Sequence, residues 1–486
     1  MPFVAPPSTA AGGPPPRATA RGAVQIFASQ GAMAVSGLAI HVALTRLLPP
    51  EDYGVLAVVT SVILWWALLG SQLFLRATTR FVAAAGERWG EVAGTALAGT
   101  AVWCSTLTVA VFLSAPGISR LLGDPGLAPY LRLFSVDVLL NGLFQTSRAI
   151  LVGRRRYRDH ATAFALYWGF KAVAVCGLVA AGLGIRGAIL GSVAASAAGL
   201  ALAWLAGGWA TGRGFPLRRL VTFSLPLLGV ALVYQTLLHL DLWWLKAAGA
   251  SGLTIGRYGL AKYTFLMLIT FGTSAGIAML PSLTRAIEEN LRESVRELVQ
   301  QSFRFVLLFG LGAVAALGAG AEGLLELVFS SSYREAALPM VLLSVAAVAF
   351  SAAGVAVSVL TAAGRPWWCL AGVVPALPIA VGLNLWLVPA RGVAGAGLAA
   401  ILAGAALVLP LALLIRRALG VFVLPWSSLR IAAAAGLVLL AGRTLSPGGF
   451  LAVIEPLIAF GSYLLLLLLV GELTRRDLEL LPFWPR

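Results

Sequence analysis

Long apolar runs separated by short polar turns are the feature that most restricts what this chain can fold into. The first run, Val24 to Leu48, is about 25 residues long, enough to cross roughly 30 Å of hydrocarbon and longer than the core of a signal peptide. The later runs lie at 54–75, 92–114, 133–153, 161–183, 187–210, 221–246, 259–281, 301–321, 337–363, 367–388, 393–415, 431–445 and 450–472. The sequence therefore predicts an all-α integral membrane protein with about fourteen transmembrane helices.

The charge pattern argues against both a soluble enzyme and a nucleic-acid partner. Only 11% of the 486 residues are charged, against roughly 25% in a typical soluble domain. The net charge of +16 comes mostly from arginines. With both termini inside, twenty-three arginines fall in the predicted cytoplasmic segments and eight on the outer side, which is the positive-inside pattern of membrane proteins. We expect a membrane protein with cytoplasmic termini and no nucleic-acid partner.

An internal repeat divides the predicted helices into two halves. The motif EDYGVLA at Tyr53 recurs as GRYGLA at Tyr258, and IRGAILG at Arg186 recurs as ARGVAGAG at Arg391; both pairs are 205 residues apart. Because each half holds six spans, the halves share one orientation in the membrane. The repeat predicts two six-helix bundles with two helices appended.

The predicted boundaries follow from the repeat and from the two ends of the chain, which lack an apolar period. The units are a disordered cytoplasmic tail, an N-terminal six-helix bundle, a C-terminal six-helix bundle, two appended transmembrane helices and a second cytoplasmic tail, at 1–22, 23–212, 213–418, 419–473 and 474–486.

No motif supports catalysis or a bound metal. The chain has no GxxxxGK[ST] phosphate loop, and its three cysteines lack the CxxC spacing of a zinc site. A membrane glycosyltransferase or polymerase would be expected to carry a large water-exposed loop with paired carboxylates, whereas the longest loop here is about 18 residues. We expect no enzymatic activity, no metal and no cofactor other than a coupling proton or sodium ion.

Polar residues form one continuous stripe along the fourth predicted span. They follow one another at intervals of four, four and three residues, as Asp137, Asn141, Gln145 and Arg148. A charge at the centre of a membrane helix costs roughly 2.5 to 3.5 kcal/mol on insertion scales, so such residues are functional candidates. Asn141, Gln145 and Arg148 are candidate substrate-binding residues and Asp137 a candidate ion-coupling residue. The alternative is a hydrogen-bonded ladder that only holds helices together.

Three further charged residues in the predicted spans are candidate site residues. Lys171 is about ten residues into the fifth span and shares a helix face with Tyr167, so a cation and an aromatic ring would meet a polar ligand there. Asp241 and Lys262 lie at depths that agree within roughly 5 Å on the seventh and eighth spans. Pairing would reduce the burial cost of both charges. The pair is then either static or, through Asp241, a coupling site.

Several segments resemble one known family. These are TRLLPPEDYGVLAV after the first span, FSLPLLGVALVYQTLLHLDLWWLKAAGASGLTIGRYGLAKY around the seventh, AMLPSLTRA, SSYREAALPMVLL and LTAAGRP. Over roughly residues 20–420 the chain resembles the polysaccharide-biosynthesis flippases, the O-antigen type members of the multidrug/oligosaccharidyl-lipid/polysaccharide exporter superfamily. The resemblance implies a bacterial inner-membrane protein that moves undecaprenyl-diphosphate-linked oligosaccharides from the cytoplasmic to the periplasmic leaflet by alternating access.

The resemblance also suggests roles for particular residues. The family's cationic cavity would map onto Arg148, Lys171 and Lys262, and its acidic position on the seventh helix onto Asp241. Glycan polymerase and chain-length regulator proteins are candidate partners. The lipid II flippase branch carries arginines inside its first two helices, whereas Arg46 lies only at the outer end of the first span here. A lipid II flippase, a drug/cation antiporter and a membrane glycan polymerase or ligase stay open as alternatives.

Overall fold

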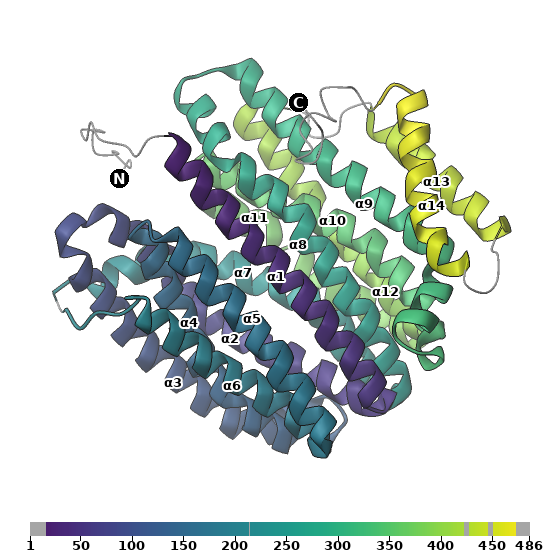
Figure 1. Ribbon diagram of the computed structural model, residues 1–486. Helices are drawn as coiled ribbons and strands as arrows, with labels where there is room; N and C mark the ends of the chain where they lie inside the picture. Colours follow the sequence, from purple (N-terminus) through teal and green to yellow (C-terminus); the bar gives the residue numbers. More distant parts are fainter. Residues whose placement is uncertain (1–15, 213, 422–426, 446–450, 473–486) are drawn as a thin grey trace.

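The computed structural model describes residues 16–212, 214–421, 427–445 and 451–472, and the regular elements within them are helical (Figure 1). Two bundles of helices stand side by side, and a hairpin of two helices lies at the edge of the second. The helices of the first bundle are α1 (Pro16–Leu47), α2 (Pro50–Ala84), α3 (Trp89–Leu121), α4 (Ala128–Gly153), α5 (Tyr157–Leu178) and α6 (Gly184–Leu205).

The second bundle begins at α7 and follows the same order. Its helices are α7 (Leu217–Ala247), α8 (Gly252–Glu288), α9 (Arg292–Val328), α10 (Ala337–Ala362), α11 (Pro366–Val373) and α12 (Ala376–Leu419). Short 3₁₀ turns precede the fourth helix of each bundle, at Pro125–Leu127 and Ser331–Ala336. The appended hairpin consists of α13 (Ser427–Leu445) and α14 (Leu451–Leu469), which pack on α9.

Helix packing repeats between the bundles. Helix α2 packs on α3 and α4 as α8 packs on α9 and α10, and α4 packs on α6 as α10 packs on α12. Helix α1 packs on α5, and its counterpart α7 packs on α11 and α12. The same partners in the same order are what an internal duplication produces. The predicted all-α membrane fold with two related halves is confirmed.

The two halves also share an unusual glycine, at the bend before the last helical segment of each half. Gly184 has φ 56° and ψ −137°, and Gly392 has φ 54° and ψ −126°, a conformation that glycine adopts without a Cβ penalty. These glycines are 208 residues apart, so matching Arg186 to Arg391 at 205 was wrong by three residues. That alignment rested on a few matching residues, whereas the matching backbone conformations of Gly184 and Gly392 identify the equivalent positions.

Eight helical segments among the described residues are long and apolar enough to cross a membrane. Two of them, Tyr157–Leu205 and Pro366–Leu419, each contain two of the predicted spans joined at a bend. Helix α1 begins at Pro16, so the predicted disordered tail 1–22 is wrong for its last residues. Proline suits the first turn of a helix, and the following Arg and Ala residues are good helix formers. Residues 1–15 and 474–486 lie outside the described residues.

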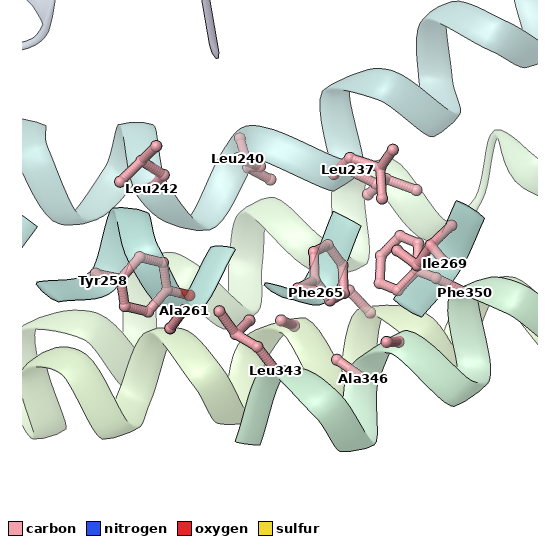
Figure 2. Close-up of a cluster of buried hydrophobic side chains, with 14 of the residues drawn as sticks. Leu237, Leu240, Leu242, Tyr258, Ala261, Phe265, Ile269, Leu343, Ala346 and Phe350 are labelled. Carbon is pink, nitrogen blue, oxygen red and sulfur yellow. The ribbon is translucent and has the colours of Figure 1, made fainter. Parts of the chain in front are cut away.

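An apolar core joins α7, α8 and α10 and surrounds the charged pair of Asp241 and Lys262. Figure 2 shows leucines of α7 above the aromatic face of α8, with α10 below. Phe265 and Phe350 meet edge-on with ring centroids 5.5 Å apart, and both are almost fully buried. Edge-to-face contacts of this kind add to the stabilisation from burial. This core fixes the relative depth of the polar side chains on α7 and α8.

Candidate functional site

Arg148 lies on α4, five residues before the helix ends, and its side chain is buried. Its guanidinium donates to Gln145 Oε1 at 2.7 Å and to His160 Nε2 at 3.1 Å. The guanidinium carbon also stands 3.8 Å from the centroid of the Phe164 ring. Helix α4 therefore supplies the cation, and α5 supplies the ring and the imidazole that hold it.

The contacts of Arg148 leave its charge without an anion. Within the part of the chain that the structure describes, Arg148 forms no salt bridge, and its buried Nε has no hydrogen-bond partner. A buried cation is costly unless an anion and hydrogen bonds compensate it. The site can therefore accept an anionic group.

His160 was not predicted to take part in this site, because the three histidines lie far apart in the sequence. It lies in the first turn of α5, four residues after Arg156, and its Nδ1 lies 3.3 Å from the Arg148 carbonyl oxygen. The signal was present in the short link from Gly153 to Tyr157, which makes α4 and α5 an antiparallel hairpin. Such a link brings the end of one helix next to the start of the following one, so a histidine in the first turn of α5 meets the arginine near the end of α4.

Lys171 is half-buried on α5, with its Nζ 5.8 Å from the Tyr167 ring centroid and 5.2 Å from that of Trp168. The predicted meeting of Lys171 with the Tyr167 ring is therefore present. Asp137 of α4 lies close enough to interact electrostatically with Lys171. The two charges connect the outer part of the stripe to α5.

The other polar residues of the stripe lie on the same face of α4 as Arg148. Asp137 is buried, and its Oδ1 has no hydrogen-bond partner among the described residues. Asn141 and Gln145 are half-buried between Asp137 and Arg148. The structure thus brings together Asp137, Asn141, Gln145 and Arg148 with Lys171 and Tyr167 inside the N-terminal bundle.

Asp241 and Lys262 form a separate, closed cluster between α7 and α8. Lys262 Nζ donates to both carboxylate oxygens of Asp241, at 2.7 and 2.6 Å. Tyr258 donates to the same carboxylate at 2.6 Å, and the backbone N–H of Leu242 at 2.9 Å. The side chains of Asp241 and Lys262 are only 2% and 4% exposed. In this conformation Lys262 is committed to its carboxylate.

Side-chain contacts tie the predicted outer ends of the two bundles together. Arg46 at the end of α1 donates to the carbonyls of Leu327 and Val328, at 2.8 and 3.1 Å, where a cation compensates the C-terminal end of a helix. Lys246 of α7 pairs with Asp124 at 2.7 Å, next to the turn between α3 and α4. These bonds hold that end closed.

Within the described residues, no group of three His, Cys, Asp or Glu side chains is placed to hold a metal ion. Cys104 and Cys369 are buried and Cys176 half-buried, and all three are free thiols.

A family profile described as polysaccharide biosynthesis protein matches residues 43–338, more than half of the chain. The chain belongs to this polysaccharide biosynthesis family. The match spans α4, α5, α7 and α8, so both polar clusters lie inside it. A comparison with curated protein sequences finds no match.

Solved structures extend the likeness to the whole fold. The lipid II flippase MurJ in an inward closed conformation superposes with a TM-score of 0.73 at 14% identity, covering 95% of this chain and 100% of that one. An inward-facing MATE family transporter of the MOP superfamily gives 0.66 at 14% identity, covering 85% and 96%. The Vibrio cholerae MATE transporter VcmN in its bent form gives 0.58 at 18% identity, covering 83% and 98%.

These structures are of transporters, and the family is one of polysaccharide biosynthesis. This member of the polysaccharide biosynthesis family is therefore a multi-pass membrane protein with the fold of the flippases and MATE transporters of the MOP superfamily. The solved structures that share its fold are those of a lipid II flippase and of MATE transporters.

Proposed function

We propose that this protein moves a polyprenyl-diphosphate-linked oligosaccharide from the cytoplasmic to the outer leaflet of a bacterial inner membrane by alternating access. The substrate serves polysaccharide synthesis, as O-antigen, capsule or exopolysaccharide. Both termini are cytoplasmic in this proposal, as the arginine distribution predicts. Polymerase and chain-length regulator proteins on the outer side are the proposed downstream partners.

The observation that carries the proposal is the uncompensated charge of Arg148. Its hydrogen-bond acceptors, Gln145 and the neutral imidazole of His160, bring no negative charge. A diphosphate supplies both negative charge and acceptor oxygens, and charge-assisted hydrogen bonds to a guanidinium are about twice as strong as neutral ones. A drug or metal cation would meet repulsion at the same place.

Lys171 and Tyr167 extend this site away from the end of α4. A lysine beside aromatic rings suits a headgroup that carries both charge and sugar, since the rings pack against the apolar faces of a pyranose and the cation binds an acidic group. Asn141 and Gln145 provide amides that pair with sugar hydroxyls. We propose these residues for the part of the substrate beyond the diphosphate.

Asp241 and Lys262 are the proposed coupling unit. The carboxylate now accepts hydrogen bonds from Lys262, Tyr258 and its own helix. A proton or sodium ion that binds Asp241 competes with Lys262, and the released lysine is then free to meet an anion. Such competition would link the ion gradient to movement of α7 against α8. Asp137, which faces Lys171, is a second proposed coupling carboxylate.

Deletion of the gene in its native host tests the function. The proposal predicts that lipid-linked glycan accumulates on the cytoplasmic face and that polymer disappears from the surface. Loss of polymer with glycan units collected on the outer face would instead support the polymerase or ligase alternative. Unchanged glycan with increased sensitivity to cationic drugs would support the antiporter, and arrested peptidoglycan synthesis the lipid II flippase.

A further inference from the structure

The partners of His160 fix its protonation state and tautomer. A guanidinium only donates hydrogen bonds, so His160 Nε2, at 3.1 Å from Arg148 NH2, must be an unprotonated acceptor. A backbone carbonyl only accepts, so Nδ1, at 3.3 Å from the Arg148 carbonyl oxygen, must carry the hydrogen. The imidazole is therefore neutral and bridges the side chain and the backbone of one residue.

In this arrangement His160 cannot take up a proton on Nε2 and accept the hydrogen bond from Arg148 at the same time. A proton that adds to Nε2 turns the acceptor into a donor, so the bond to Arg148 breaks and two positive charges face each other. Gln145 Oε1 is then the one remaining acceptor in the Arg148 contacts described above. Arg148 NH2 and the newly protonated Nε2 of His160 then both lack an acceptor, and one anionic group between them supplies oxygens for both.

We propose that His160 is a positioning residue that releases Arg148 to the anionic headgroup of the substrate when its imidazole takes up a proton. The inference rests on the proposed function, because it takes the anion to be the polyprenyl diphosphate. The proton comes from water at the α4–α5 end of the bundle and adds to the Nε2 lone pair, and no bond other than hydrogen bonds is made or broken.

The surroundings of His160 contain few other charges that compete for this role. On its own helix, Asp159 is paired with Arg156 at 2.6 Å. Next to the turn, Arg154 donates to the Gly207 carbonyl and stacks on the Trp89 ring.

The neighbouring helices carry few further ionisable residues close to His160. Helix α6 carries one ionisable residue, Arg186, at its opposite end. The described side chains of α1 that are ionisable, His41 and Arg46, lie in the outer half of that helix. Tyr167 of α5 interacts electrostatically with Arg148. Among the described side chains, Arg148 is the cation in hydrogen-bond contact with His160.

Two substitutions separate positioning from simple structure. His160→Gln offers an amide oxygen to Arg148 and an amide N–H to the carbonyl, so it keeps both bonds but cannot take up a proton. His160→Ala removes both bonds. His239→Gln is the matched control, because His239 is a buried histidine on α7, in the other bundle.

The test measures binding of undecaprenyl diphosphate to the purified full-length protein in nanodiscs between about pH 5.5 and about pH 8, the range in which an imidazole that gains an anionic partner takes up a proton. The diphosphate changes its own charge over this range, so affinities are compared between variants at each pH. We expect the ratio of the wild-type affinity to the His160→Gln affinity to rise toward low pH, by up to about tenfold per pH unit, the limit for one proton taken up on binding. The His239→Gln ratio should stay constant.

A second measurement records proton uptake when the lipid is added in weak buffer. Wild type should take up a proton that His160→Gln does not, by the reciprocity of linked binding. Parallel pH profiles, or equal proton uptake in the two proteins, would overturn the inference. Failure of the proposed function is distinguished by Arg148→Ala: if that variant binds the lipid as wild type does, the site itself is wrong, whatever the profile of His160→Gln.

Discussion

Gly54 of α2 lies against Gly256 of α8 so closely that a Cβ on Gly54 would stand 2.8 Å from the Gly256 nitrogen. A Cβ on Gly256 would stand 2.1 Å from the carbonyl oxygen of Pro50. The two bundles therefore meet backbone to backbone near their outer ends, where α2 and α8 cross. Small residues at such crossings allow close packing of membrane helices.

The close contact at this crossing predicts that a Gly→Ala substitution destabilises the protein here but not at an open position. Gly256→Ala should lower thermal stability in detergent by about 1 to 3 kcal/mol, the usual cost of overpacking, because the obstacle is backbone. Gly436→Ala on α13 is the control: nothing lies within 4 Å of the added Cβ, and alanine is favoured over glycine inside a helix. Equal melting temperatures for the two variants would show that α2 and α8 can move apart at this crossing without loss of stability.

Lys171 is predicted to bind the headgroup beyond the diphosphate. Lys171→Ala should reduce glycan export at normal protein abundance, whereas Lys171→Arg should keep part of it because the charge remains. Export by the alanine variant at the wild-type rate would make Lys171 a structural partner of Asp137. Export and abundance are measured in the same cells, so a folding defect is recognised.

Asp241 and Lys262 are predicted to act as one unit. Removing one partner of a buried pair costs about 3 to 5 kcal/mol because the other charge is left unpaired. Asp241→Asn should therefore slow export and weaken its dependence on the ion gradient, and the double variant with Lys262→Ala should be less impaired than the two single defects combined. Vesicles under imposed gradients provide the measurement. Additive defects with intact gradient dependence would reduce Asp241 to a packing residue.

The topology is predicted to place three loops outside. Reporter fusions after residues 120, 250 and 335 should give periplasmic signals, because the arginine-rich loops lie on the other side. Any cytoplasmic signal among the three would break the proposed orientation. It would leave the fold as described, since the helices pack in the same way in either orientation.

The repeat and the helices were predictable because apolar length and charge distribution act over whole segments. The depth match of Asp241 and Lys262 was also sufficient to predict their pair, since helix rise is constant. The start of α1 and the equivalence of Gly184 with Gly392 were not predictable in this way. Local helix propensity decides the first, and backbone conformation decides the second.

The contacts of single side chains were the least predictable feature. Arg148 was identified from its stripe, but its imidazole partner comes from the turn that folds α5 back on α4. In the same way, Arg46 binds the carbonyls at the end of α9, far along the chain. A periodic pattern gives the face of a helix, whereas the partner on that face depends on which helix packs there.

Reconstituted transport tests the central claim most directly. Wild type, Arg148→Ala and the control Arg132→Ala are placed in liposomes loaded on one leaflet with a polyprenyl-diphosphate-linked oligosaccharide, and a membrane-impermeant lectin reports its arrival on the other. Arg132 is exposed and stacks on Phe112 in the outer part of the bundle, away from the α4–α5 link. We predict that wild type and Arg132→Ala move the lipid, and that Arg148→Ala moves it at least about tenfold more slowly, the equivalent of about 1.4 kcal/mol. Equal rates for Arg148→Ala and wild type, or no movement by wild type, would contradict the claim that a buried arginine of this fold binds and carries a diphosphate headgroup.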